Sequence, residues 1–203
     1  MKIQSDFTEF KPIERSYYLR ETVDVARDLL GQLLVRVVDE NLIVVRITEV
    51  EAYRGLDDPA SHAFRGKRGR AKIMFETVGV AYVYLSYGIH YCLNVVAKSP
   101  QQEAGAVLIR SGEPILGYEF MKKFHNKDEC KISSGPGNFT RALNIDSRYN
   151  GHDLTDKNDL YISGGWLNKN EKILQSRRIG ISNGTDKPWR FLISNNCTVS
   201  KKP

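Results

Sequence analysis

Hydrophobic and polar residues alternate along two neighbouring runs, residues 81–86 and 89–96, which meet at Tyr87-Gly88. Alternation with a period of two is typical of strands, and Gly88 permits a tight reversal, so the pattern predicts a β-hairpin. For most of these residues a place in the core explains the pattern. Turns favour Gly, Asn, Asp and Pro, so an aromatic at Tyr87 indicates a side chain that meets something outside the protein, such as stacked bases.

Strands and helices are predicted on both sides of this hairpin. Apolar residues at helical spacing predict a helix over residues 21–30, and Gly31 suits its C-terminal end. Residues 32–39 and 42–53 are rich in β-branched residues and predict two central strands. Further strands are predicted over residues 104–111, 160–162, 173–179 and 189–193, helices over residues 113–124 and 139–143, an N-terminal arm over residues 1–20, and a frayed tail over residues 198–203.

Two carboxylates lie near the end of the second central strand. Glu49 and Glu51 are two residues apart, so their side chains share a face. A carboxylate held at a strand end beside an aromatic residue, here Tyr53, can activate water or stabilise a developing cation. Surface carboxylates are common, so a solvated strand edge remains the alternative, and it fits Glu49 better than Glu51.

A strongly basic segment lies between this strand and the hairpin. Residues 64–72 carry five basic residues, no acid and two glycines. Their place between the carboxylates and Tyr87 favours a loop that contacts phosphates and orders on binding; a solvated loop or a targeting patch is the alternative. The basic residues are Arg65, Lys67, Arg68, Arg70 and Lys72.

Two other segments carry candidate chemistry. Arg110 ends an apolar strand, where an arginine needs a partner, and Glu51 is the obvious candidate. Ser134-Gly135-Pro136 precedes a helix, and an exposed helix N-terminus is a common phosphate site, although this signal alone is weak. His62 has no neighbour at metal-ligand spacing, so we expect a structural histidine, no metal and no cofactor.

Composition and charge favour a soluble protein with an acidic partner. The 203 residues are 41% hydrophobic and 27% charged, with a formal net charge of +6, which favours nucleic acid. Three cysteines at wide spacing argue against a disulfide framework and a zinc site, so we expect a reducing compartment, either the bacterial cytoplasm or a nucleus. The first residues lack the apolar run of a signal peptide, and no run is long enough to span a membrane.

Taken together, these residues resemble the alkyladenine (3-methyladenine) DNA glycosylase family. The similarity extends from the helix at Glu21 to the strand that ends near Ile193. Its most specific parts, in chain order, are Glu51-Ala52-Tyr53 with His62, residues 82–88 running on to Asn94, Leu108-Ile109-Arg110, and Ser134-Gly135-Pro136. The resemblance implies an α+β fold over residues 1–203, a single mixed domain with a curved, largely antiparallel sheet and a protruding β-hairpin, flanked by helices.

The resemblance also implies an activity and a role for each matched residue. A monofunctional DNA glycosylase of base excision repair would flip 3-methyladenine, 7-methylguanine, hypoxanthine or ethenoadenine out of duplex DNA and hydrolyse the N-glycosidic bond, as a monomer. The implied catalytic residues are Glu51 and Arg110, the base pocket is Tyr53, His62, Tyr84 and Asn94, the intercalating residues are Tyr87 and Ile89, and the DNA backbone contacts are Arg65, Lys67, Arg68, Arg70, Lys72, Ser134, Gly135 and Arg141.

Three departures from the family pattern bear on DNA binding. Ala71 stands where Asn or Thr is common, Asn138 replaces a lysine, and Glu76 puts an acid near the expected DNA face. None touches the implied chemistry. Two other functions fit the same residues: a lesion-binding protein without catalysis, for which Glu51 has little use because it repels phosphate, and an RNA-binding or RNA-modifying module that prefers single strands.

Overall fold

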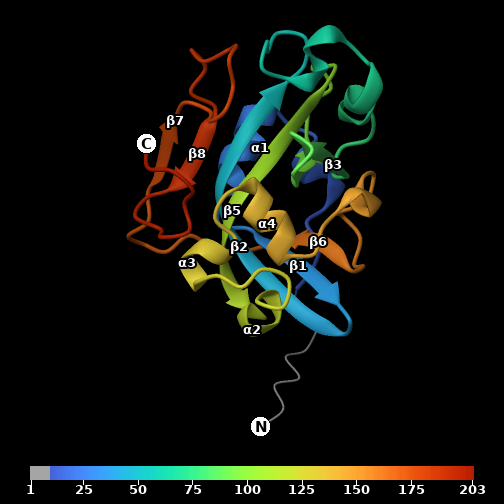
Figure 1. Ribbon diagram of the computed structural model, residues 1–203. Coiled ribbons are helices and arrows are strands. Elements are labelled where there is room, and N and C mark those ends of the chain that lie inside the picture. The colour runs from blue at the N-terminus through green and yellow to red at the C-terminus, as the bar shows by residue number, and fades with distance from the viewer. Residues whose placement is uncertain (1–9) are drawn as a thin grey trace.

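Two long strands, β2 (Asn41–Arg54) and β5 (Gly105–Leu116), form the centre of the molecule (Figure 1). They pair antiparallel along most of their length in the computed structural model, which describes residues 10–203. β-branched residues such as Ile43, Val45 and Ile47 fill the buried positions of β2, as expected for a strand covered on both faces. The pairing shifts register at three places, and such bulges bend and twist a sheet.

The remaining strands extend this pair into an eight-stranded antiparallel sheet. Its order is β3-β4-β5-β2-β1-β6, with β8 pairing both β2 and β7 beside that path. Figure 1 shows β7 and β8 side by side along one side of the molecule. The bounds are β1 (Leu33–Val38), β3 (Ala81–Ser86), β4 (His90–Val96), β6 (Leu160–Ser163), β7 (Ile173–Ser176) and β8 (Arg190–Ile193).

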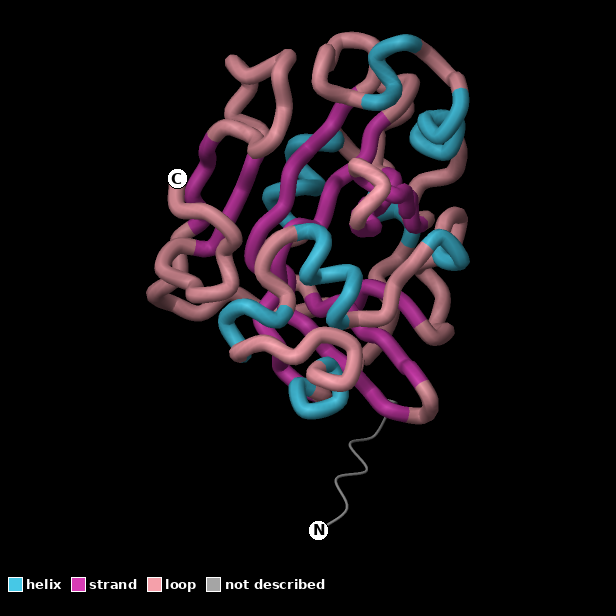
Figure 2. The backbone as a smooth tube through the Cα atoms, viewed as in Figure 1, coloured by secondary structure: helices cyan, strands magenta, loops and turns pink. Residues whose placement is uncertain are grey.

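Short helices surround the sheet (Figure 2). Val25 and Ala26 of one helix and Phe139 of another are fully buried in the main core cluster, so amphipathic helical faces complete the core. The predicted α+β class, with a curved, largely antiparallel sheet, a hairpin and flanking helices, is confirmed. The helices are η1 (Arg15–Tyr18), α1 (Thr22–Asp28), η2 (His62–Arg65), η3 (Gly69–Phe75), α2 (Tyr118–Met121), α3 (Glu129–Ile132), α4 (Pro136–Ala142) and η4 (Ser147–Tyr149).

The predicted helix over residues 113–124 is wrong. β5 continues to Leu116, and only Tyr118–Met121 is helical. Pro114 lies opposite Val45 at a register shift, where a residue without an N–H can be accommodated. Pairing with β2, about 70 residues earlier in the chain, supplies the hydrogen bonds of this segment. The local pattern around Pro114 could not show that partner.

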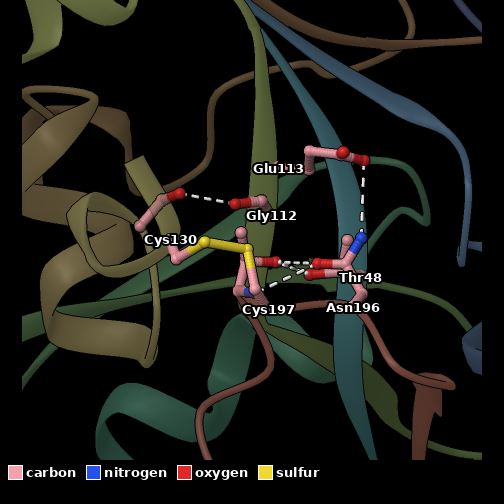
Figure 3. The surroundings of a disulfide bond; sticks show 8 residues. Thr48, Gly112, Glu113, Cys130, Asn196 and Cys197 are labelled. Carbon is pink, nitrogen blue, oxygen red and sulfur yellow. Dashed lines mark hydrogen bonds between the residues drawn. A yellow bond between two sulfur atoms is a disulfide. The ribbon is translucent and has the colours of Figure 1, made fainter. Parts of the chain in front are cut away.

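The C-terminal tail is packed against the sheet, which corrects the predicted fraying. Thr198 is buried and its hydroxyl lies 2.7 Å from that of Thr48 on β2, while residues 201–203 are exposed. A disulfide joins Cys197 to Cys130 of α3, so the expectation of unpaired cysteines is wrong for these two (Figure 3). They are 67 residues apart in sequence, and spacing of that kind carries no information about proximity. Cys92 is free and buried.

The predicted N-terminal arm is only partly described, because residues 1–9 lie outside the described residues. From Phe10 onward the segment runs against the sheet, and Ile13 donates a backbone hydrogen bond to Ile162. Tyr18 is fully buried in the main core, so this part of the arm belongs to the body of the protein. Within residues 10–203, no helix has the length and apolar character that a membrane span requires.

Candidate active site

A cavity of about 430 Å³ opens between the β3–β4 hairpin, β5, η2 and η3, and residues 179–181. Seven of the residues to which the family resemblance gives a role line it. The lining includes Tyr53, His62, Arg70, Tyr82, Tyr84, Tyr87, Asn94, Arg110 and Ile179. Segments that are distant in sequence therefore meet around one space large enough for a planar base.

Three aromatic rings form one wall of this cavity. Tyr82 and Tyr84 alternate along β3, so both project from the same face, with ring centroids 5.1 Å apart. The ring of His62 meets Tyr84 edge-on at 4.7 Å, and its Nδ1 lies 2.7 Å from the Tyr82 hydroxyl. Burial, and then the charge of Arg70, lower the pKa of His62, although the residue as a whole stays exposed. The neutral imidazole therefore predominates near pH 7.

Asn94 on β4 and Tyr53 on β2 also line the cavity. Asn94 is buried on β4, and its Nδ2 donates to the backbone oxygen of Tyr82 at 2.9 Å. The hydroxyl of Tyr53, at the end of β2, donates to Glu51 at 2.8 Å. Burial, and then the charge of Glu51, raise the pKa of Tyr53, so the phenol stays protonated. Both side chains are thus held in place by the protein itself.

Glu51 lies directly behind the cavity wall and is fully buried. Its Oε1 accepts from the backbone N–H of Ile179 at 2.8 Å, and its Oε2 accepts from the Tyr53 hydroxyl. Arg110 Nη1 lies 3.3 Å from Oε2. The ion pair predicted between Glu51 and Arg110 is present, and three cavity-lining residues contact this carboxylate.

Glu49 is also fully buried, so the solvated strand edge considered for it is wrong. Arg110 Nε donates to it at 2.9 Å and Arg190 Nε at 2.8 Å. Burial alone would raise the pKa of Glu49, but the charge of Arg110, the hydrogen bond from the Ser200 N–H and the charge of Arg190 outweigh burial and lower it. Glu49 is therefore ionised near pH 7.

The hairpin tip projects its aromatic residue into solvent. Tyr87 is 84% exposed and Ile89 is 74% exposed, the most open of the large apolar residues in the described chain. Tyr87 and Gly88 both have positive φ, +50° and +70°, which is typical of the type I′ hairpin turn. The predicted hairpin is therefore confirmed, and its tip presents an apolar wedge beside the cavity mouth.

The basic segment folds into η2 and η3, and its basic side chains lie in different surroundings. Arg65, Arg68 and Lys72 are exposed. Lys67 pairs with Glu76 at 2.7 Å, so the acid that departs from the family pattern is neutralised. Arg70 turns to the cavity, where its guanidinium lies 5.6 Å from the centre of the Tyr84 ring. Ala71, another departure, is buried and makes no polar side-chain contact.

The segment before α4 is used mainly inside the protein. The N–H of Gly135 donates to Ser111 Oγ at 3.0 Å, and the backbone oxygen of Ser134 accepts from Asn138 Nδ2 at 2.7 Å. Asn138 also contacts His125 at 3.0 Å. The N–H of Gly135 is thus bound inside the protein, and the predicted phosphate contact of this helix N-terminus stays a prediction. Arg141 is exposed near the hairpin tip, where it lines the same depression as Ile89.

Several site residues were missed from sequence. Tyr82 could have been found, because it alternates with Tyr84 on one strand face. Arg178 covers the Tyr53 ring at 4.7 Å and is buried, and Ile179 follows it with the N–H that binds Glu51. No local signal marks these residues or Ser200, because they reach the site only through the fold.

Comparison with known proteins identifies the family. A family model described as methylpurine-DNA glycosylase matches residues 16–197. The chain therefore belongs to the methylpurine-DNA glycosylase family, a class of enzymes that hydrolyse N-glycosyl bonds in DNA, and the resemblance found in its sequence is confirmed.

Curated relatives match over nearly the whole chain. A protein of Carboxydothermus hydrogenoformans is 46% identical over 191 residues, covering 94% of this chain and 99% of the relative. Proteins of Methanocella arvoryzae and Natranaerobius thermophilus are 43% and 38% identical over 195 residues, and they cover 94% and 93% of this chain and 96% and 98% of their own lengths. Each is named a putative 3-methyladenine DNA glycosylase.

Proposed function

We propose that this enzyme flips alkylated and deaminated purines out of duplex DNA and releases them with a water molecule activated by Glu51, leaving an abasic site. The substrates would be 3-methyladenine, 7-methylguanine, hypoxanthine and ethenoadenine. The observation that carries the proposal is the buried Glu51–Arg110 pair directly behind an aromatic cavity. The names of the relatives support the lesion class.

The residue types fit the chemistry of purine release. Departure of the base builds positive charge on the sugar, and the carboxylate of Glu51 would stabilise that charge and take a proton from water. Arg110 would orient the same water from the other side. A methylated purine is already cationic and leaves without a proton donor, whereas neutral hypoxanthine needs protonation at a ring nitrogen.

The cavity walls suit a flat, electron-poor base. The rings of Tyr53, Tyr84 and His62 would stack against it, since cationic bases interact favourably with electron-rich aromatic faces. The amide of Asn94, fixed by its bond to Tyr82, would meet the exocyclic edge and disfavour the 2-amino group of guanine. Selection would then come from both stacking and exclusion.

We also propose that the enzyme works as a monomer on double-stranded DNA. The proposed place of action is the bacterial cytoplasm or a nucleus, because those compartments hold the substrate.

The direct test is incubation with duplexes that carry one hypoxanthine, ethenoadenine or 3-methyladenine. We expect free base and alkali-labile abasic sites, with no strand cleavage by the enzyme. Borohydride should trap no covalent adduct, because the matched pocket residues include no lysine and water is the nucleophile. Binding without base release would favour the lesion-binding alternative, and preference for single-stranded RNA would favour the RNA-binding one.

Replacing Tyr87 with serine should lower the population of flipped base. A flipped nucleotide leaves a gap in the stack, unstacking costs a few kcal/mol per step, and a rigid wedge that fills the gap recovers a comparable amount. We expect Tyr87→Ser to slow single-turnover excision of paired hypoxanthine far more than that of bulged hypoxanthine, which needs little unpairing. Equal losses on the two substrates would show that Tyr87 has a structural role only.

The exposed part of the basic segment should set the salt dependence of DNA binding. Affinity falls linearly with salt on a log–log plot, with a slope set by the phosphates contacted. Neutralising Arg65 and Arg68 should flatten this slope by about one to two units. Lys169→Ser with Lys172→Ser is the control, since these exposed lysines lie near β7. An unchanged slope in the first variant would mean that the segment is a solvated surface.

A further inference from the structure

A second carboxylate, Glu49, is buried beside the proposed catalytic pair and has no part in the chemistry described above. It accepts five hydrogen bonds, at distances of 2.6 to 3.0 Å. The donors are Arg110 Nε, Arg190 Nε, Ser111 Oγ, and both the N–H and Oγ of Ser200. Every lone-pair direction of this carboxylate is therefore in use, and it does not line the cavity.

The guanidinium of Arg110 is fixed at three points, one of them by Glu49. Its Nε donates to Glu49 at 2.9 Å, its Nη2 lies 3.4 Å from Ser200 Oγ, and its Nη1 lies 3.3 Å from Glu51. A guanidinium is a planar fork, so fixing one edge sets the direction of the other. The edge bound by Glu49 and Ser200 therefore orients Nη1 towards Glu51 and the cavity.

Charge in this cluster is balanced. The ion pairs of Glu49 and Glu51 join two carboxylates to two guanidiniums, those of Arg110 and Arg190, and the neighbouring Arg178 is balanced by Asp58. Without the charge of Glu49, two guanidiniums would face one carboxylate in a buried site, where charges interact strongly. The excess positive charge would lie near the sugar, whose own positive charge builds up during base release.

The tail reaches Glu49 because it is held just before Ser200. Thr198 contacts Thr48 at 2.7 Å, and Cys197 is joined to Cys130 (Figure 3). On the other side of Ser200, the backbone oxygen of Lys201 accepts a hydrogen bond from Arg190. The last described residues of the chain thus supply part of the support for Arg110.

We propose that Glu49 is a positioning residue. Together with Ser200 of the C-terminal tail, it holds Arg110 at the angle that the excision step requires, and its charge balances that of the buried guanidiniums. The inference rests on the proposed function of Glu51 and Arg110 and assigns to Glu49 no contact with DNA. Its effect is on the rate of base release, and binding of the lesion is left unchanged.

The test is a double-mutant cycle with single-turnover excision of hypoxanthine as one readout. Binding to a duplex with a tetrahydrofuran abasic analogue is the other. Glu49→Gln keeps the shape and removes the charge, and we expect a rate lower by about 10- to 100-fold, the scale of a misplaced catalytic group, with Kd within about threefold. In an Arg110→Gln background, Glu49→Gln should lower the excision rate by less than about threefold, because the guanidinium that Glu49 positions is absent.

Glu103→Gln is the matched control, since it makes the same substitution at an exposed carboxylate away from this cluster, and we expect the rate to stay within about threefold. Ser200→Ala removes one of the five donors to Glu49 and the contact with Arg110 Nη2, but leaves the charge of Glu49 in place, so we expect a smaller loss of rate than in Glu49→Gln. If Glu49→Gln does not fold, truncation after Val199 removes the Ser200 and Lys201 contacts without altering the core. That variant should lose rate with unchanged Kd, and again less so in the Arg110→Gln background.

The outcomes separate this inference from the proposed function. A near wild-type rate in Glu49→Gln, or an equal loss with and without Arg110, would overturn the positioning role. If Glu51→Gln is inactive in the same assay, the proposed function stands even then. Full activity of Glu51→Gln would overturn the proposed function itself.

Discussion

Replacing Glu51 with glutamine is expected to lower single-turnover excision by roughly two to four orders of magnitude, the usual contribution of an acid–base group. The amide keeps an oxygen that can accept the N–H of Ile179, which lies 2.8 Å from Oε1 in the native protein. It cannot take a proton from water or balance the charge on the sugar. Folding and binding of lesion DNA should therefore persist while base release fails.

The measurement is the burst of free hypoxanthine with enzyme in excess over a labelled duplex. Glu103→Gln is the matched control, because it makes the same substitution at an exposed carboxylate just before β5 and should leave the rate unchanged. Thermal melts of both variants would check folding. Excision by Glu51→Gln within tenfold of the native rate would contradict the assignment of Glu51.

Replacing Asp58 with alanine is expected to lower the free energy of unfolding by about 3–5 kcal/mol, the cost of leaving a buried charge unpaired. The side chains of Asp58 and Arg178 are both 0% exposed and form two hydrogen bonds of 2.6 and 2.7 Å. Arg178 also covers the Tyr53 ring and precedes Ile179, whose N–H binds Glu51. The rate of excision should fall together with stability.

Urea unfolding followed by circular dichroism would measure the loss. Asp57→Ala is the control from the neighbouring residue, because Asp57 pairs with Arg54 at the surface and such exposed pairs contribute about 1 kcal/mol or less. Adding Arg178→Met to Asp58→Ala removes the unpaired charge and should restore part of the stability. A loss below about 1 kcal/mol in Asp58→Ala would mean that water reaches the pair.

The parts of the fold that follow from sequence are those set by near neighbours. The β3–β4 hairpin could be predicted because alternation and a turn glycine occur within 16 residues, from Ala81 to Val96. β2 was predicted to within one residue at each end for the same reason, since its β-branched run is continuous. The extension of β5 through Pro114 was missed because its cause is the partner strand.

The candidate site divides in the same way. Glu51, Tyr53 and Arg110 occur in short recognisable segments, and the structure brings them together at one cavity. The support behind them comes from Arg190 and Ser200, about 140 and 150 residues after Glu49, through β8 and the tail. Contacts between residues so far apart produce no periodic pattern and no turn signal in the local sequence. They are therefore visible only in the folded structure.

The hairpin tip is a place where folding and function favour different residues. Tyr87 adopts a left-handed backbone conformation, with φ of +50°, which costs a residue with a side chain about 1–2 kcal/mol. Asn-Gly is the preferred pair for such a turn. An asparagine at position 87 would lose almost no packing against the core, since Tyr87 is almost fully exposed. A redesign for thermostability that followed turn preferences alone would replace this tyrosine first, and would give up the proposed DNA wedge for a small gain in stability.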